Sequence, residues 1–353
     1  WTFNREAKFS EHGLVLETES GSYALKFAGM KEIRQPDQWF RMNKAQNKDQ
    51  WLEAMKMRAI ISFNAVYADK EDNIMLLHNT AGPIRNEAYD WKQPVDGTNS
   101  TLIWNEITPF DEIPLLINPN SGWIVSANQD PFRASSLKDN LKRSDFSKTL
   151  GIETKMTNRA YRVIEIFDND KKFTEQDLLD AKFDNEYSKE SRSIKYLQNV
   201  LAQEYEDQEF QEAQAVLNAW DLKTDNNNRS AALGVCILSE EWRAFMNRID
   251  APSSKEMFKK CIDELNDAFG RVDPLWSEVN MLIRGDLSLP IQGGPDTLRA
   301  VYGRPQDDGI LKAVAGDGLV VSLSWDSDGN QESQSIHQYG SATQDSSSKH
   351  YDD

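Results

Sequence analysis

Several residue types on which catalytic centres commonly depend are scarce in this sequence. Its 353 residues include four histidines and two cysteines. The histidines, His12, His78, His337 and His350, are too far apart for the spacing of a metal site. No Gly-x-Ser-x-Gly occurs, and Gly293-Gly294-Pro295 lacks the Lys-Ser/Thr that follows in a phosphate-binding loop. Metal–histidine, serine-elbow and P-loop chemistry are therefore disfavoured.

Positive charge and long apolar runs are scarce as well. Lys and Arg number 40 against 57 Asp and Glu, which gives a formal net charge of -17. Nucleic acids and anionic membranes bind positively charged surfaces, so we expect neither as a partner. No apolar run of about 18 residues is present, so no transmembrane helix is predicted. Hydrophobic residues still make up 39% of the chain, which is enough for a core.

The two cysteines, Cys236 and Cys261, fall within predicted helices, and neither belongs to a Cys-x-x-Cys pair. A disulfide between them is one interpretation. We favour two buried free thiols, because a pair without a recognisable framework carries no signal for pairing.

Turn signals and alternating hydrophobicity predict strands in the first part of the chain. Residues 8–28 alternate around Ser20-Gly21-Ser22, which is typical of a β-hairpin. Residues 47–50 have the spacing of a capping box before a helix at 51–61. Two more strands, at 62–67 and 74–78, are joined by a polar turn.

The middle of the chain is helical, with long amphipathic helices predicted over 188–221 and 229–249. Strands return at 319–325 and 334–339. The turn between them, 326–330, begins like a calcium-binding EF-hand loop but lacks its glycine and final glutamate, so a hairpin turn is favoured. Strands, helices and strands again predict the α+β class with a helical insertion.

We divide the chain into a strand-rich part at 1–150, a mainly helical part at 151–285 and returning strands at 286–353. These parts are interpreted as one incomplete domain. The abrupt ends and the absence of a signal sequence favour an internal piece of a longer polypeptide.

The segment 118–131 is the most informative. An Asn118-Pro119 turn leads into a short apolar strand at 123–125, followed by the amides Asn128 and Gln129 and a second turn at Asp130-Pro131. An amide side chain held rigidly at the end of a strand can donate a hydrogen bond to the oxyanion of a transition state.

This segment is part of four blocks whose order and spacing resemble the penicillin acylase family of N-terminal-nucleophile hydrolases. The blocks are 63–69 with Asn73-Ile74; 82–97; 104–128; and 293–296 with Gly316-Asp317, 337–340 and 350–352. The resemblance implies the C-terminal portion of the large chain of such an enzyme. It also implies part of an αββα sandwich, in which antiparallel sheets lie between helices.

In that family, a serine at the start of the catalytic chain attacks an amide, and its own α-amino group is the base. Asn128 matches the asparagine that stabilises the oxyanion, although the usual second asparagine is replaced by Gln129. Arg162 matches an arginine near the catalytic centre. The alternative for Asn128 is an asparagine that satisfies the turn at Asp130-Pro131, and the alternative for Arg162 is an exposed charge on a helix.

Other matches concern binding. Phe63 and Trp39 fall where the family lines its acyl pocket, with ordinary core positions as the alternative. Asp139 and the carbonyl of Trp91 match ligands of one structural calcium, while catalysis itself is expected to need no cofactor. The nucleophile and the smaller chain cut from the same precursor are expected before Trp1, so we expect this chain alone to be inactive.

The implied activity is hydrolysis of the amide bond of an N-acylated small molecule, through an acyl-enzyme. Penicillin-type compounds, N-acyl-homoserine lactones and acyl-peptides are the candidate substrates, and the expected location is the periplasm or the outside of the cell. Two alternatives stay open. One is a non-catalytic scaffold homologue, and the other is a carbohydrate- or peptide-binding module, since Trp, Asn and Gly-rich loops also suit sugar stacking.

Overall fold

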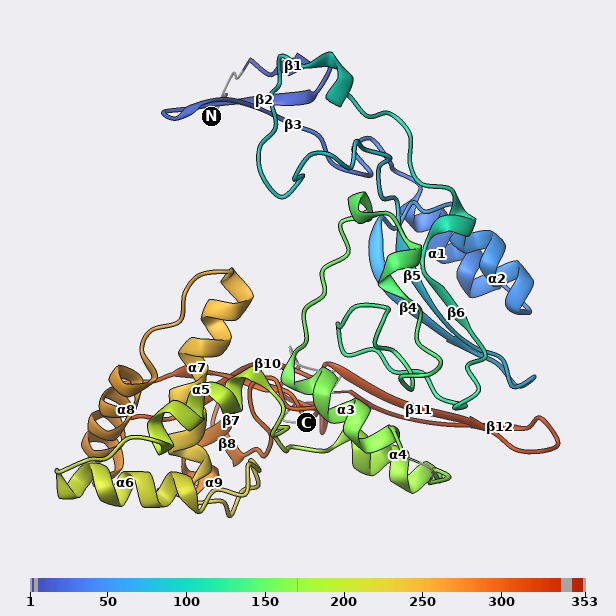
Figure 1. The fold of residues 1–353 in the computed structure, drawn as a ribbon. Helices are drawn as coiled ribbons and strands as arrows, with labels where there is room; N and C mark the ends of the chain where they lie inside the picture. Colours follow the sequence, from blue (N-terminus) through green and yellow to red (C-terminus); the bar gives the residue numbers. More distant parts are fainter. Residues whose placement is uncertain (1, 3–5, 170, 338–344, 352–353) are drawn as a thin grey trace. The chain divides into compact units, whose positions relative to one another are not determined.

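The computed structural model describes residues 2, 6–169, 171–337 and 345–351 (Figure 1). The chain divides into two compact units, unit 1 (residues 1–155) and unit 2 (residues 156–353), and each is described by itself. Both combine helices with sheets that are mostly antiparallel, which confirms the α+β class. Within the described ranges, no helix has both the length and the apolar character needed to cross a bilayer.

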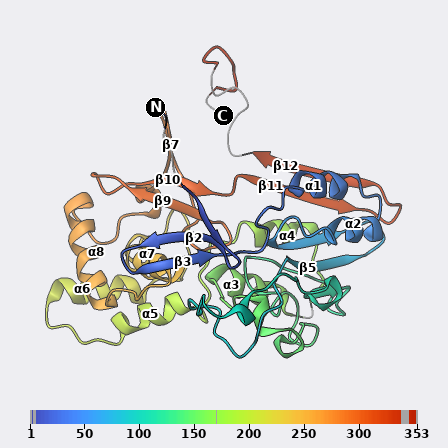
Figure 2. The same ribbon diagram turned by 90° about the horizontal axis from the view of Figure 1, so that it is seen from above.

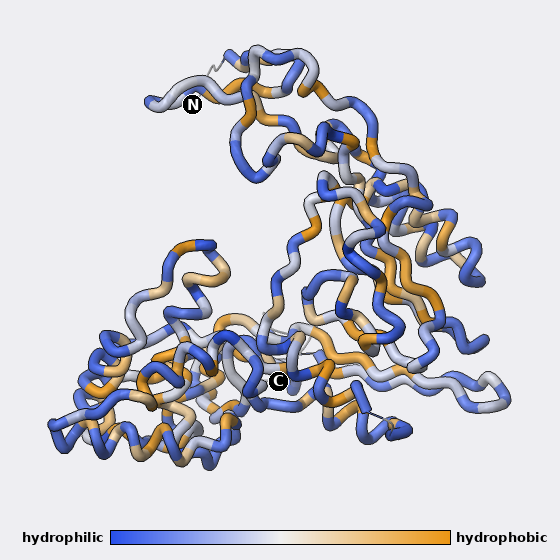
Figure 3. Tube along the Cα trace, viewed as in Figure 1, coloured by the Kyte–Doolittle hydropathy of each residue, from blue (hydrophilic) through white to orange (hydrophobic). Residues whose placement is uncertain are grey.

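The core of unit 1 is a three-stranded antiparallel sheet. It consists of β4 (Ser62–Ala68), β5 (Ile74–Thr80) and β6 (Leu115–Ile117), in that order. The predicted hairpin of strands at 62–67 and 74–78 is confirmed. Hydrophobic residues run along the strands of this sheet (Figure 3), and the central strand β5 is the most buried of the three because both of its faces are covered.

The two faces of this sheet pack against different parts of unit 1. On the first face, Ala65, Met75 and Leu77 pack against Trp51 and Met55 of helix α2 (Lys48–Met55). On the second face, a smaller cluster joins the sheet to the segment 124–134. Its members are Leu76, Leu116, Ala134, Ile124 and Leu141. The loop with the candidate catalytic asparagine is therefore anchored on the second face.

The N-cap of helix α2 is confirmed, but the helix begins at Lys48 and ends at Met55, both earlier than predicted. The side chain of Asn47 accepts a hydrogen bond from the Gln50 backbone N–H at 3.0 Å, which is the expected N-cap. The predicted end at residue 61 is wrong, because Arg58 has a left-handed backbone with φ 46°. The Ile60 N–H then donates to the buried side chain of Gln38 in α1 (Gln35–Lys44), and this bond replaces a helical one.

The predicted strands at 8–28 are confirmed as a small antiparallel sheet of β1 (Lys8–Ser10), β2 (Gly13–Thr18) and β3 (Gly21–Leu25).

Unit 2 is built around a helical core. Its helices are α3 (Asn158–Phe167), α4 (Glu175–Lys182), α5 (Arg192–Leu201), α6 (Gln208–Asn218), α7 (Ala231–Asn247), α8 (Ser254–Phe269) and α9 (Trp276–Val279). Helix α7 confirms the helix predicted over 229–249. Gly234 in α7 is required by close packing, because a Cβ there would lie 2.3 Å from the ring of Trp220.

The single long helix predicted over 188–221 is wrong, because the chain breaks between α5 and α6. Asp207 caps α6 by accepting a hydrogen bond from Glu209 N–H at 2.9 Å. The side chain of Gln214 in α6 donates to the carbonyl of Leu201, the last residue of α5, and to that of Gln203 just after it. The break lets both helices bury their apolar faces in one cluster, which a continuous helix cannot do.

Unit 2 also contains a four-stranded sheet in the order β8-β7-β10-β9. Its strands are β7 (Asn280–Arg284), β8 (Leu287–Pro290), β9 (Val301–Pro305) and β10 (Leu311–Gly316). A separate long hairpin of β11 (Leu319–Trp325) and β12 (Gln331–His337) is visible in Figure 2. Its turn is closed by Asp326, which accepts hydrogen bonds from Asp328 and Asn330, as the hairpin interpretation requires. Residues 338 and 339 of the predicted last strand lie outside the described residues.

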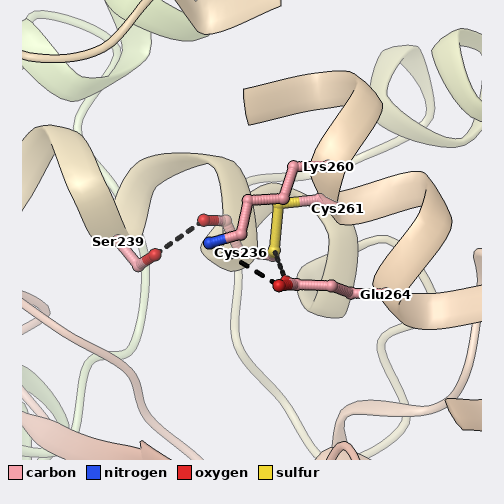
Figure 4. Close-up of a disulfide and its surroundings, with 5 residues drawn as sticks. All are labelled: Cys236, Ser239, Lys260, Cys261 and Glu264. Carbon is pink, nitrogen blue, oxygen red and sulfur yellow. Dashed lines mark hydrogen bonds and ion pairs between the residues drawn. A yellow bond between two sulfur atoms is a disulfide. The ribbon is translucent and has the colours of Figure 1, made fainter. Parts of the chain in front are cut away.

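The preference for two free thiols is wrong. Cys236 in α7 and Cys261 in α8 form a disulfide, with their Cα atoms 6.0 Å apart (Figure 4). Cys261 is fully buried in the helical core. The physical reason is the turn between α7 and α8, which folds the two helices against each other so that these positions face one another. Helical periodicity marks each cysteine as inward-facing but does not show which residue lies opposite.

Candidate functional site

Asn128 lies in unit 1, in a loop on the second face of the sheet. The Val125 N–H donates to the Ala134 carbonyl at 2.9 Å and closes the loop. The predicted strand at 123–125 is wrong, because in the described structure these residues belong to no strand. Asn128 has a left-handed backbone with φ 67°, which asparagine tolerates better than most other residues, and it is exposed on the surface of unit 1.

Gln129 braces this loop from inside. It is 3% exposed, and its side-chain Nε2 donates to the carbonyls of Val125 and Arg133, both at 3.1 Å. Its Oε1 accepts a hydrogen bond from Ala127 N–H at 2.5 Å. The glutamine that replaces the family's second asparagine is therefore used fully in holding the backbone on both sides of residue 128.

Asn64 connects the loop to the sheet, and sequence reasoning missed it. Its Nδ2 donates to the Gln129 carbonyl at 2.9 Å, and its Oδ1 lies 2.8 Å from Nδ1 of His78. Asn64 on β4 and His78 on β5 are direct cross-strand partners. One signal could have found this pair. In the predicted hairpin, both residues point to the same face of the sheet, and polar side chains on a face that is otherwise covered need partners.

Burial determines the protonation of His78. It lowers the pKa of His78 to about 4, so the ring is neutral near pH 7. Since Asn64 presents its oxygen to the ring, the Nδ1 atom carries the proton and donates it. Burial also raises the pKa of Asp130, which belongs to the same loop and whose carboxyl accepts a hydrogen bond from Phe132 N–H.

The two residues predicted to bind the acyl group are brought together. The rings of Trp39, in α1, and Phe63, on β4, have centroids 6.1 Å apart with planes inclined at 33°. Trp39 is 48% exposed, whereas Phe63 is half-buried and packs against the core cluster of the first face. The pair is an aromatic surface open to solvent on one side. Its role in substrate binding stays a prediction.

Arg162 lies in α3 of unit 2 and is not an exposed helix charge. Its guanidinium donates to both carboxylate oxygens of Asp184, at 3.0 and 2.9 Å, and to Glu186 at 2.9 Å. Burial alone would lower the pKa of Arg162, but the hydrogen bond and charge of Asp184, together with the charge of Glu186, outweigh it and raise the pKa. Arg162 therefore stays charged and is held rigidly. Its role near a catalytic centre stays a prediction.

The residues predicted to bind calcium have local partners. The carboxylate of Asp139 accepts a hydrogen bond from Ser121 N–H at 2.7 Å, and this bond is the main reason that its pKa is lowered. Trp91 donates its indole N–H to the Asn86 carbonyl. One carboxylate and one carbonyl fall short of the roughly six to eight oxygen ligands that calcium takes. Asp139 and the Trp91 carbonyl therefore do not make a calcium site by themselves.

The side chains of the described chain offer no other metal site. The one cluster of potential ligands consists of Cys236, Cys261 and Glu264, and its two sulfurs are joined in the disulfide of Figure 4. A cavity of about 420 Å³ borders the same disulfide, between α7, α8 and the strands β9 and β10. It includes none of the predicted site residues.

The protein is therefore of the α+β class, and its candidate site presents the Asn128 amide from a loop that is hydrogen-bonded to a sheet. Comparison with known proteins gives the family: residues 2–353 match the family model of penicillin amidase. The chain therefore belongs to the penicillin amidase family, which confirms the resemblance seen in the sequence.

Two relatives illustrate the match. Penicillin G acylase of Escherichia coli is 33% identical over 124 residues, a stretch that covers 34% of this chain and 14% of that protein. The structure resembles the thermostable penicillin G acylase from Alcaligenes faecalis, with a TM-score of 0.62 and 16% identity. That match covers 98% of this chain and 72% of the other chain, and at this identity it shows a common fold.

Proposed function

We propose that the protein to which this chain belongs hydrolyses the amide bond of N-acylated small molecules. The observation that carries this proposal is the loop 124–134, which holds Asn128 in a left-handed conformation between two anchored neighbours. The motif resemblance in the sequence matches Asn128 to the asparagine that stabilises the oxyanion in penicillin acylases. A family match over residues 2–353 favours an amidohydrolase over a carbohydrate-binding module.

The proposed mechanism uses a serine that lies outside this chain. The serine hydroxyl attacks the amide carbonyl while its own α-amino group takes the proton. The oxyanion that forms accepts a hydrogen bond from Nδ2 of Asn128. Collapse of the tetrahedral intermediate transfers the proton to the amine that leaves, and water then hydrolyses the acyl-enzyme by the same steps.

Asn128 is exposed in unit 1, so this unit alone does not exclude water from it. We assign that enclosure to other parts of the precursor, including the smaller chain. An oxyanion donor is most effective in a water-excluded site, so the isolated chain is expected to be inactive. Penicillin-type compounds, N-acyl-homoserine lactones and acyl-peptides remain the candidate substrates, with the half-exposed pair of Trp39 and Phe63 as the proposed contact for the acyl group.

We also propose an exported location, in the periplasm or outside the cell. The Cys236–Cys261 disulfide supports it, because disulfides form and persist in oxidising compartments. Calcium is proposed only as a structural ion that Asp139 and the Trp91 carbonyl would bind together with ligands from elsewhere. Arg162 is proposed to lie near the reacting groups as a fixed positive charge.

The test is substitution of Asn128 in the complete, matured enzyme, assayed with chromogenic acyl amides. Asn128→Gly is the main variant, because glycine adopts a φ of 67° without strain, so that loss of the side chain is not combined with backbone strain. We expect kcat to fall about 10²- to 10³-fold in this variant and in Asn128→Ala, with little change in KM. Asn99→Ala, in another loop of unit 1, is the control. Near-normal turnover in both Asn128 variants would refute the assignment.

A further inference from the structure

We propose that Asn64 is a positioning residue that fixes the peptide backbone around Asn128, and that His78 supports the Asn64 amide by a hydrogen bond to its oxygen. This inference rests on the proposed function, since it concerns the geometry of the proposed oxyanion donor. It adds two residues, both outside the predicted site, that act on the reaction through Asn128 and touch neither substrate nor nucleophile.

The backbone is held on both sides of residue 128. On one side, Ala127 N–H is bound by the Gln129 side chain at 2.5 Å. On the other side, the Gln129 carbonyl is bound by Nδ2 of Asn64 at 2.9 Å. The bond within the loop moves whenever the loop moves, whereas the bond from Asn64 ties the loop to the sheet. Asn64 therefore fixes the position of Asn128 relative to the sheet, which is rigid.

The Asn64 amide has one allowed orientation. A backbone carbonyl can only accept, so the Asn64 atom that faces the Gln129 carbonyl is the nitrogen. The oxygen of the same amide then faces His78 at 2.8 Å, and the ring donates to it from Nδ1. An inverted amide would place its oxygen against the oxygen of the Gln129 carbonyl, so that a repulsive contact would replace the hydrogen bond between sheet and loop.

Asn64 and His78 are themselves fixed, because they are cross-strand partners on β4 and β5. The Asn64 side chain also lies 3.4 Å from the Ser126 hydroxyl, at the other edge of the loop. The path from sheet to loop therefore consists of short polar contacts from His78 to Asn64 and from Asn64 to Gln129, all of which are half-buried or buried. A catalytic donor is effective only when it is held to within about 0.5 Å of its required position, and such a path supplies that restraint.

The test is Asn64→Asp in the complete, matured enzyme. Aspartate has the same shape and still accepts from His78, but it places a carboxylate oxygen against the Gln129 carbonyl in place of a donor. We expect kcat on acyl amides to fall about 10- to 100-fold, with a change in KM of less than about 3-fold. Asn64→Ala is the second variant, in case the new charge prevents folding. Asn99→Asp adds the same charge elsewhere in unit 1 and serves as the matched control.

A double-mutant cycle with Asn128→Gly separates the two proposals. If Asn64 acts through Asn128, Asn64→Asp lowers kcat in the wild-type background and has no further effect in the Asn128→Gly background. An equal loss in both backgrounds, or near-normal kcat for Asn64→Asp and Asn64→Ala, overturns the positioning role and leaves the proposed function standing. Near-normal turnover of Asn128→Gly overturns both.

Discussion

Reduction of the disulfide between Cys236 and Cys261 should strongly destabilise unit 2. The bond closes a loop with a sequence separation of 25. In the chain-entropy model, a loop of this length stabilises the folded state by about 3.5 kcal/mol at 25 °C. Cys261 is fully buried in the helical core, so the crosslink restrains α7 and α8 where they pack most closely.

The assay is urea unfolding of the chain, with and without a reductant, followed by tryptophan fluorescence. Trp220 and Trp276 are both buried in unit 2 and report on its core. With a slope of about 2 kcal/mol/M, the loss corresponds to a midpoint lower by about 1.5 to 2 M in the reduced chain. The double variant Cys236→Ala/Cys261→Ala should unfold at a similar or lower midpoint and should not respond to the reductant.

Two results would refute this reasoning. Titration of two free thiols in the non-reduced, denatured chain would show that the bond does not exist. Equal midpoints for oxidised and reduced protein would show that the bond forms but does not restrain the unfolded state in the way that the model assumes.

Two other predictions concern unit 1. Burial lowers the pKa of His78 from 6.5 to about 4, so between these values the unfolded chain binds a proton that the folded chain does not. The free energy of unfolding should therefore fall as the pH drops from about 6.5 to 4, by at most about 3 kcal/mol. Melting experiments at pH 7 and 4.5 should show a smaller loss of stability for His78→Gln than for the wild type. An identical loss in both proteins would contradict the lowered pKa of His78. In the matured enzyme, Phe63→Leu and Trp39→Ala should change the ratio of kcat/KM between large and small acyl groups by about 10-fold or more. A uniform change across an acyl series would exclude the aromatic pair from the acyl contact.

The sequence was a good guide wherever a signal is local. The turn between β4 and β5, the Asn47 cap and helix α7 all follow from residues a few positions apart, and each is present in the structure. The order and spacing of short motifs also indicated the family, and the family match over residues 2–353 confirms it. Such features survive in a single sequence because they depend on turn chemistry and periodicity, which act over a few residues.

The errors share one cause, which is competition from contacts distant in sequence. The amphipathic pattern over 188–221 is continuous, but the chain gains more from folding α6 back beside α5 than from extending one helix. The loop at 123–125 has the composition of a strand, yet it packs on a sheet face instead of joining an edge. In each segment the local pattern fits the predicted element and the observed one equally well, so the sequence alone could not distinguish between them.

By itself, the sequence determined the α+β class, the family and the identity of Asn128 as the candidate donor. Only the tertiary structure decided how that asparagine is held. Asn64 and His78 lie far from residue 128 along the chain, and a β-hairpin register brings them beneath the loop. The pairing of Cys236 with Cys261 depends in the same way on how two helices face each other. Residue type specifies which bonds a side chain can make, but its partner is chosen by the packing of the whole unit.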